Sequence, residues 1–150
     1  MMAAAVGVPS WFDVHITNEP FPTLSYRTGL TVYEESFIRG RLVSRGWNGA
    51  GYINPDDIRL DPDRHPTPQV FNIEVEGQLL ASHWEWAGLE QHPEEKGLHA
   101  IVRLRHARRP VGLAVHPLLD GTPILTPWLE ITNIAEHPVA LAQRAAWSGV

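Results

Sequence analysis

The tetrapeptide His83-Trp84-Glu85-Trp86 combines residue types that proteins use to hold a sugar. On a β-strand successive side chains point to opposite faces, so the two tryptophans share one face and His83 and Glu85 share the other. Two tryptophans on one face can stack on the CH face of a sugar ring, and His83 and Glu85 can hydrogen-bond its hydroxyl groups. The alternative is that Trp84 and Trp86 fill the core while His83 and Glu85 face water, and the size of the aromatic side chains favours this alternative.

The other residue types that bind metals lack the spacing that a metal site needs. The eight histidines are scattered along the chain and none lies in an HExxH motif, so we predict no zinc site. The cluster Asp56, Asp57, Asp61 and Asp63 is like a calcium loop only in its charge, because it lacks the D-x-[DN]-x-[DN]-G register. The prediction is a solvated loop, with no metal and no cofactor.

Two pairs of neighbouring glutamates raise the question of glycosidic hydrolysis, which uses two carboxyl groups roughly 5–10 Å apart across a sugar pocket. The pairs are Glu34-Glu35 and Glu94-Glu95, and on a strand the two side chains of each pair point apart. We therefore predict solvated charge for both pairs. A G-x-S-x-G motif and a glycine-rich phosphate loop are also lacking, so the sequence contains no visible active site.

Strands must position these residues, because the hydrophobic pattern repeats every two residues and no amphipathic helix of three turns is present. Residues 69–75 (QVFNIEV), for example, place Phe71, Ile73 and Val75 on one face. Expected strands cover residues 12–16, 30–39, 69–75, 78–81, 83–90, 99–106, 111–119, 124–132 and 139–147, with turns at 76–77, 120–121 and 133–138. We predict an all-β chain that forms a single antiparallel β-sandwich domain over residues 1–150.

The composition limits the class of protein. A length of 150 residues suits one domain, and the net charge of −5 argues against a dedicated nucleic-acid binder. There is no cysteine, which excludes disulfides and thiol nucleophiles. No apolar run approaches the roughly 20 residues of a membrane span, and the start of the sequence lacks the basic region of a signal peptide. We expect a soluble, cytoplasmic protein.

Two further segments affect the interpretation. Residues 54–68 (NPDDIRLDPDRHPTP) are rich in proline and aspartate and predict a long surface loop, and loops of this length often carry function. The sequence stops at Trp147-Ser148-Gly149-Val150, directly after an apolar strand and without a polar tail. We expect from this a piece of a longer protein, with a terminal strand tied into a sheet as the alternative.

Residues 120–141 (DGTPILTPWLEITNIAEHPVAL) resemble a stretch of the N-terminal β-supersandwich domain of the α-galactosidase-like glycoside hydrolases, family 36. There a strand of the W-L-E-I-T-N kind turns through a polar x-x-x-P-V corner into the next strand, and an aromatic-small-glycine segment follows, like Trp147-Ser148-Gly149. On such a hairpin Trp128 and Trp147 are expected to meet across the pair. Strand-turn-strand pieces of this type also occur in immunoglobulin-like bacterial modules.

The resemblance implies a role for the domain. In that family a separate C-terminal (β/α)₈ barrel holds the catalytic aspartates, and neither aspartate has a counterpart in this sequence. The sandwich packs on the barrel, supports homo-oligomer contacts and in some members sends a loop toward a sugar pocket. Residues 54–64, preceded by the glycine-rich 46–51, suit this last role. The resemblance thus offers Trp47, Asp56, Asp57 and Arg59 as sugar contacts, with an ordinary surface loop as the alternative.

Three functions follow as hypotheses. The first is a non-catalytic N-terminal domain of an α-galactosidase-like glycosidase, which supports the catalytic barrel and its galactoside pocket and exposes an apolar flank. The second is a stand-alone carbohydrate-binding module, whose solvent-facing platform is Trp84 with Trp86 or Trp47 with Tyr52. The third is a structural or adhesion sandwich, which generic fold signals alone support.

Overall fold

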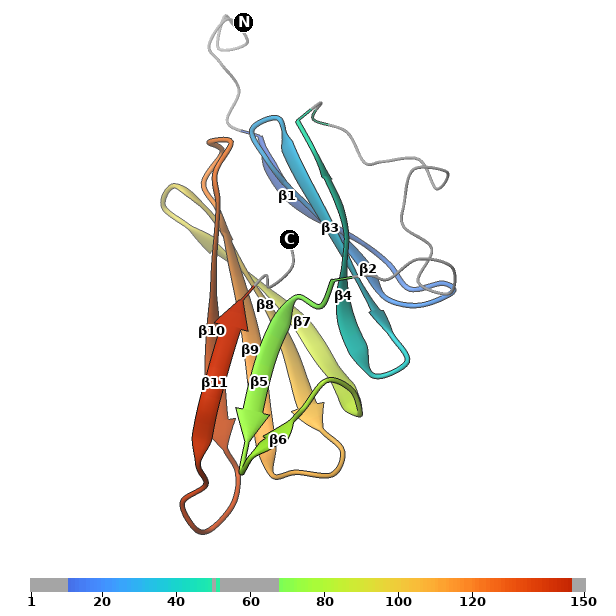
Figure 1. Ribbon diagram of the computed structural model, residues 1–150. Coiled ribbons are helices and arrows are strands. Elements are labelled where there is room, and N and C mark those ends of the chain that lie inside the picture. The colour runs from blue at the N-terminus through green and yellow to red at the C-terminus, as the bar shows by residue number, and fades with distance from the viewer. Residues whose placement is uncertain (1–10, 50, 52–67, 147–150) are drawn as a thin grey trace, which may run out of the picture.

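Strands are the regular elements of the chain in the computed structural model, which describes residues 11–49, 51 and 68–146 (Figure 1). These residues contain no helix, and hence none that is long and apolar enough to cross a membrane. The strands are β1 (Phe12–Thr17), β2 (Thr23–Thr28), β3 (Thr31–Ile38), β4 (Arg41–Asn48), β5 (Phe71–Val75), β6 (Gln78–Leu79), β7 (Trp84–Glu94), β8 (Gly97–His106), β9 (Val111–Leu119), β10 (Leu125–Asn133) and β11 (Leu141–Ala146).

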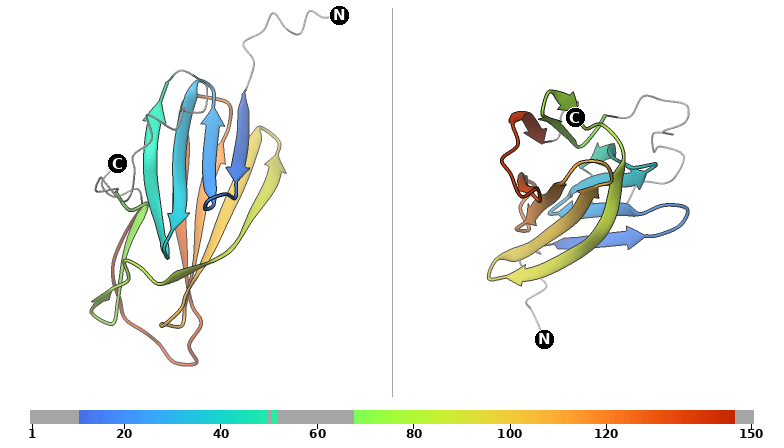
Figure 2. Two further views of the ribbon diagram at one scale, coloured as in Figure 1. Left: turned by 90° about the vertical axis from the view of Figure 1, so that its right-hand side faces the viewer. Right: turned by 90° about the horizontal axis from the view of Figure 1, so that it is seen from below.

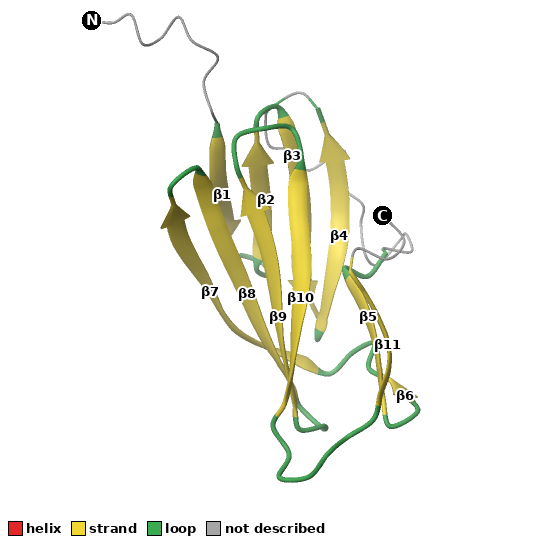
Figure 3. Cartoon of the chain, turned by 90° about the vertical axis from the view of Figure 1, so that its left-hand side faces the viewer, coloured by secondary structure: helices red, strands yellow, loops and turns green. Residues whose placement is uncertain are grey.

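Three antiparallel sheets arise from these strands. Their orders are β1-β2-β3-β4, β10-β9-β8-β7 and β11-β5-β6. In the left view of Figure 2 the first four-stranded sheet lies in front of the second, so the two pack face to face. Figure 3 shows the small sheet beside the lower end of this pair. The predicted all-β, antiparallel sandwich is therefore confirmed.

One hydrophobic core joins the three sheets. In β5 the side chains alternate, with Phe71, Ile73 and Val75 buried between half-buried neighbours, which is the predicted pattern. Each fully buried aliphatic side chain stabilises the fold by about 1.5–3 kcal/mol relative to an exposed one. The cluster draws on every sheet and includes Leu24, Tyr33, Leu42, Phe71, Ile73, Trp84, Val102, Leu104, Leu113 and Val115. A shared core of this kind agrees with a single domain.

The predicted turns are formed by local chemistry. Glu76 and Gly77 both have positive φ values, 51° and 73°, as a two-residue hairpin turn requires. Asp120 Oδ1 accepts hydrogen bonds from the backbone N–H and the hydroxyl of Thr122, at 2.9 and 2.6 Å. Asn133 Oδ1 accepts from the Ala135 N–H at 2.9 Å and closes the next corner. The turns at 76–77, 120–121 and 133–138 are thus confirmed.

Two strands were not predicted, because their polar residues give them a sequence pattern typical of loops. β2 reads TLSYRT and β4 reads RLVSRGWN, yet most of their side chains are buried. The buried hydroxyl groups hydrogen-bond one another and the backbone: Thr23 Oγ1 lies 2.9 Å from Ser36 Oγ, and Thr28 Oγ1 donates to the Thr122 carbonyl at 2.6 Å. Because these groups are satisfied, the interior of the sandwich tolerates them.

The prediction of solvated charge is wrong for Glu34 and Glu35, which are both fully buried in β3. The reason is that β3 lies between β2 and β4 and is covered on both faces. A β-bulge separates the two glutamates, and Tyr26 Oη donates a 2.6 Å hydrogen bond to Glu35 Oε1. Burial raises the pKa of Glu35 to about 7, against the smaller lowering effect of the tyrosine hydroxyl. This carboxyl therefore titrates near neutral pH.

Candidate functional site

The exposed face of the sheet β10-β9-β8-β7 gathers aromatic, imidazole and charged side chains. Strand alternation produces it: Val102 and Leu104 of β8 point into the core, so the residues between them point outward. β10 alternates in the same way, with Trp128 and Glu130 exposed between half-buried neighbours. We call this surface the Trp128 face and define it by Trp128, Glu130, His116, His99, Arg103, Glu90 and His92.

Trp128 rests on two imidazole rings. It lies opposite His116 in the β10–β9 ladder, and the two rings stack with centroids 4.9 Å apart and planes only 8° apart. The His99 ring lies 4.9 Å from the indole as well. His116 is 6% exposed, whereas Trp128 is 39% exposed. The imidazoles thus support the indole from within the sheet, and the rest of the ring remains open to solvent.

The two imidazoles share a hydrogen bond, and burial favours the neutral form of His116. His99 Nε2 and His116 Nδ1 are 2.8 Å apart, so one ring donates and the other accepts. Burial lowers the pKa of His116, and the nearby His99 lowers it further. His116 Nε2 is buried and makes no hydrogen bond with any described residue. A neutral, buried His116 gives Trp128 a rigid and largely apolar support.

Charged groups surround this support. Glu90 forms an ion pair with Arg103 and lies 3.2 Å from His92 Nε2, and these hydrogen bonds lower the pKa of the Glu90 carboxyl. His99 Nδ1 lies 3.4 Å from Glu94 Oε1. The face therefore presents an exposed indole with carboxylate, guanidinium and imidazole groups beside it. An aromatic ring with hydrogen-bonding groups at its edge is an arrangement that can hold a sugar.

The residues predicted from the sequence do not share one surface. Trp84 is 3% exposed and faces the core, with its Nε1 donating to the Leu80 carbonyl at 3.0 Å. Trp86 is half-buried, and its ring lies 5.8 Å from Phe37. For Trp84 and Trp86 the alternative, a place in the core, therefore describes the structure better than a platform open to solvent.

Trp47 is the exposed member of the predicted set. It ends β4 on the other large sheet, is 44% exposed, and lies against Tyr33 with ring centroids 4.3 Å apart. The remaining predicted contacts, Asp56, Asp57 and Arg59, lie outside the described residues, as do Tyr52 and Trp147. The structure thus keeps Trp47 apart from Trp84 and Trp86. The predicted hairpin on which Trp128 and Trp147 would meet is wrong, because β10 pairs with β9 and β11 pairs with β5 in a different sheet.

The sequence predicted that Trp128 lies on a hairpin, but it did not predict the Trp128 face. The signal was present, because Trp128 stands between Thr126 and Glu130 at the spacing that puts all three on one strand face. The partners on β8 and β9 were not visible, since pairing His99 with His116 needs the strand register. The described residues contain no group of three or more histidine, aspartate or glutamate side chains arranged to hold a metal ion.

Comparisons with known proteins give no relative for this chain. No family model matches it, and neither a curated protein nor a solved structure is significantly similar to it. The likeness of residues 120–141 to the glycoside hydrolases therefore rests on the residues themselves.

Proposed function

We propose that the chain is the N-terminal sandwich domain of an α-galactosidase-like glycoside hydrolase, which supports a C-terminal catalytic barrel and its galactoside pocket. The course of residues 120–141 carries this proposal. They form a turn capped by Asp120, the strand β10, a corner closed by Asn133, and the start of β11. The order of turn, strand, corner and strand is the one that the resemblance implies, whereas the two strands pair with β9 and β5 and form no hairpin with each other. Trp128 lies on an exposed face.

An apolar end of the sandwich supports a docking role. Trp11, Leu30 and Ile124 are all exposed there. The turn after β2 packs against the turn after β9 through the bond from Thr28 Oγ1 to the Thr122 carbonyl, and the Gly29 N–H donates to the Trp11 carbonyl at 2.7 Å. Apolar side chains gathered in this way favour contact with another protein surface over contact with water. In our proposal the barrel is the part that covers them.

A stand-alone carbohydrate-binding module is the second candidate function. The observation that favours it is the Trp128 face, where an exposed indole is backed by His116 and flanked by charged groups. Such a surface binds sugar without a neighbouring domain, whereas an accessory domain completes its site only with the barrel.

The reading frame that encodes this chain decides between the two candidates. Under our proposal it continues past Val150 into a (β/α)₈ barrel, and the protein made from the complete frame hydrolyses an α-galactoside such as raffinose. A complete frame without a barrel, together with saturable binding of galactose to the chain by calorimetry, would establish the module instead. A complete frame without a barrel and without sugar binding would reject both.

The variant Trp128→Ala is expected to raise the KM of the complete protein for an α-galactoside by about 3- to 10-fold, with kcat nearly unchanged. The reason is that stacking on an aromatic ring is worth about 0.5–1.5 kcal/mol of binding, and a loss of uniform binding changes KM alone. Leu141→Ala is the matched control, because Leu141 is also 39% exposed and apolar but lies on β11 of the small sheet. Equal effects of both variants on KM would contradict a role specific to the Trp128 face.

A further inference from the structure

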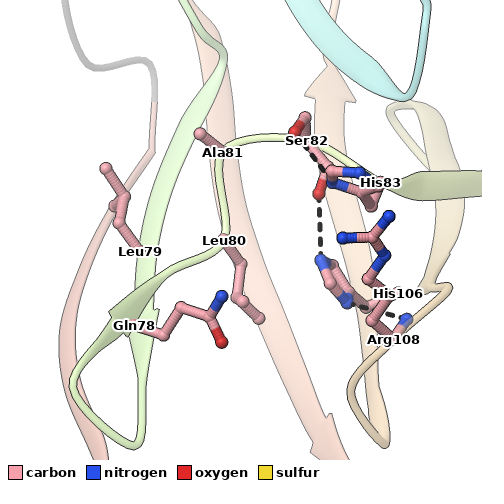
Figure 4. Close-up of a pocket in the computed structure, with 8 residues that line it drawn as sticks. All are labelled: Gln78, Leu79, Leu80, Ala81, Ser82, His83, His106 and Arg108. Carbon is pink, nitrogen blue, oxygen red and sulfur yellow. Dashed lines mark hydrogen bonds between the residues drawn. The ribbon is translucent and has the colours of Figure 1, made fainter.

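A polar pocket lies between the segment that enters β7 and the turn that leaves β8, away from the Trp128 face. Its volume is about 180 Å³, which suits a small ion or a single chemical group better than a drug-sized molecule. Figure 4 shows the eight residues that line it: Gln78, Leu79, Leu80, Ala81, Ser82, His83, His106 and Arg108.

The wall that contains His83 is held in a strained backbone conformation. His83 has a φ of 70°, a region that side chains other than glycine rarely occupy. Its neighbours hold it there: the Trp84 N–H donates to the Gly40 carbonyl at 3.1 Å, and the Ala107 N–H donates to the His83 carbonyl at 2.8 Å. A Cβ atom at Gly40 would come within 3.0 Å of the His83 nitrogen, so glycine permits this close approach. Strain of this kind persists at sites where the surrounding structure imposes it.

His106 fixes the opposite wall and is not itself free to bind. Its Nδ1 accepts the backbone N–H groups of Arg108 and Arg109 at 3.2 and 3.0 Å. The proton therefore sits on Nε2, which donates to the Ser82 carbonyl at 2.9 Å. Burial lowers the pKa of His106, and the positive charge around it lowers it further, so the ring stays neutral. This one imidazole ties the turn after β8 to the segment before β7.

The side chains that remain at the pocket are hydrogen-bond donors. The Arg108 guanidinium is exposed and has no partner among the described residues. Gln78 Oε1 accepts two bonds from the Arg109 guanidinium, at 2.9 and 2.5 Å, which leaves the Gln78 amide NH₂ able to donate. Ser82 Oγ lies 3.0 Å from His83 Nδ1, so a serine hydroxyl that donates there leaves the proton of His83 on Nε2.

The charge around the pocket is positive. Its lining contains the cationic Arg108 guanidinium and no acidic residue. Both His83 and Arg108 lie near enough to His106 to lower its pKa, and Figure 4 draws them on the same side of the pocket, with Gln78 across from them. The turn that precedes β4 also packs here through Gly40, with an arginine on either side of it in sequence. Cationic and neutral donors that surround a small cavity favour an anion.

We propose that this pocket binds a tetrahedral oxyanion, such as inorganic phosphate or the phosphate group of a small molecule. The planar guanidinium of Arg108 makes paired hydrogen bonds to two phosphate oxygens. His83 Nε2 and the Gln78 amide donate to the others, and the neutral His106 holds the two walls at their spacing. The pocket and the Trp128 face share no residue, so this proposal does not depend on the proposed function.

The test is a titration of the chain with inorganic phosphate, followed by the amide NMR shifts of residues 78–83 and 106–109. We expect saturable shifts that are confined to these residues. Arg108→Ala is expected to weaken phosphate binding by about tenfold or more, since a hydrogen bond to a charged group is worth about 1.5–3 kcal/mol. The fold should survive, because the Arg108 side chain has no described partner and its backbone N–H is unchanged.

Arg105→Ala is the matched control, because it removes the same charge from an exposed position on β8 outside the pocket. It is expected to change phosphate affinity less than twofold, a small effect for one surface charge at moderate salt (~0.15 M). Arg108→Lys keeps the charge without the paired geometry and is expected to bind with intermediate affinity. Equal losses of phosphate affinity in Arg105→Ala and Arg108→Ala would overturn the proposal. Amide shifts that spread over the surface without saturation would do the same, because they would indicate non-specific electrostatic attraction of phosphate.

Discussion

Replacing Glu35 with glutamine is expected to stabilise the protein by about 2–3 kcal/mol more at pH 8 than at pH 5. Glu35 is fully buried in β3 and has a pKa of about 7 in the folded protein. In the unfolded chain the same carboxyl titrates near its ordinary value of 4.5. A shift of one pKa unit corresponds to about 1.4 kcal/mol, so the buried carboxylate costs about 3 kcal/mol once it is ionised.

The pH dependence of this stabilisation follows from the linkage between proton binding and folding. Between pH 4.5 and 7 the folded state binds more protons at Glu35 than the unfolded state does, so this group lowers the free energy of unfolding as the pH rises. Most of that loss is present at pH 8 and little of it at pH 5. Glutamine does not titrate, and its carbonyl oxygen can accept the hydrogen bond that Tyr26 Oη donates to Glu35.

The measurement is urea-induced unfolding of both proteins at pH 5 and at pH 8, followed by tryptophan fluorescence. Comparing two proteins at the same pH cancels the histidines, which act in the opposite direction because burial lowers the pKa values of His106 and His116. Glu85→Gln controls for the loss of a surface carboxylate, since Glu85 is exposed on β7, and should change stability by less than about 0.5 kcal/mol. An effect of Glu35→Gln that is the same at both pH values would show that the carboxyl titrates normally.

Trp84→Ala is expected to lower the free energy of unfolding by about 3–5 kcal/mol, the range for removing a large aromatic side chain from a core. The Trp84 ring contacts Phe71 edge-on at 5.4 Å and His106 at 4.9 Å, and its Nε1–H donates to the Leu80 carbonyl. Alanine would leave a cavity where β5, β7 and β8 meet, and it would leave the Leu80 carbonyl without this partner.

The two exposed tryptophans provide the controls for Trp84. Trp128→Ala and Trp47→Ala are each expected to cost about 1 kcal/mol or less, because much of each side chain is already in water. Thermal or urea unfolding followed by far-UV circular dichroism measures all three variants without depending on tryptophan emission. Comparable losses for Trp84 and Trp128 would mean that the burial assigned to these two residues is wrong.

The sequence predicted the strands that alternate or are rich in strand-forming residues, including β3 and β9, which are buried on both faces. It missed β2 and β4, whose polar residues are typical of loops. β5 alternates because one side meets the core and the other is partly open to water, so Phe71 and Ile73 stand out. β2 and much of β4 are buried, but the hydroxyl-rich sequence of β2 and the arginine, serine and glycine residues of β4 resemble those of exposed loops. The same cause misplaced Glu34 and Glu35, because a carboxylate in a strand is normally exposed.

The two sites depend on contacts that no single segment carries. The Trp128 face needs the register that sets His116 opposite Trp128, and the phosphate pocket needs the contact between Gly40 and His83. Each of these pairs joins residues from different strands or turns, so the local sequence pattern does not predict the contact. Trp84 illustrates the converse, since its burial follows from residue type and strand alternation alone.

The pairing of β11 with β5 has a consequence for the order in which the molecule assembles. Most neighbouring strands are joined by short hairpins, but β5 meets β11 only through the ladder from Leu141–Val75 to Ala146–Phe71 (Figure 1). On the ribosome β5 can pair with β6 at once, but its ladder with β11 cannot form until nearly the whole described chain has been synthesised. Closing so large a loop is slow, so we expect the β5–β11 ladder to be among the last contacts of the molecule to form.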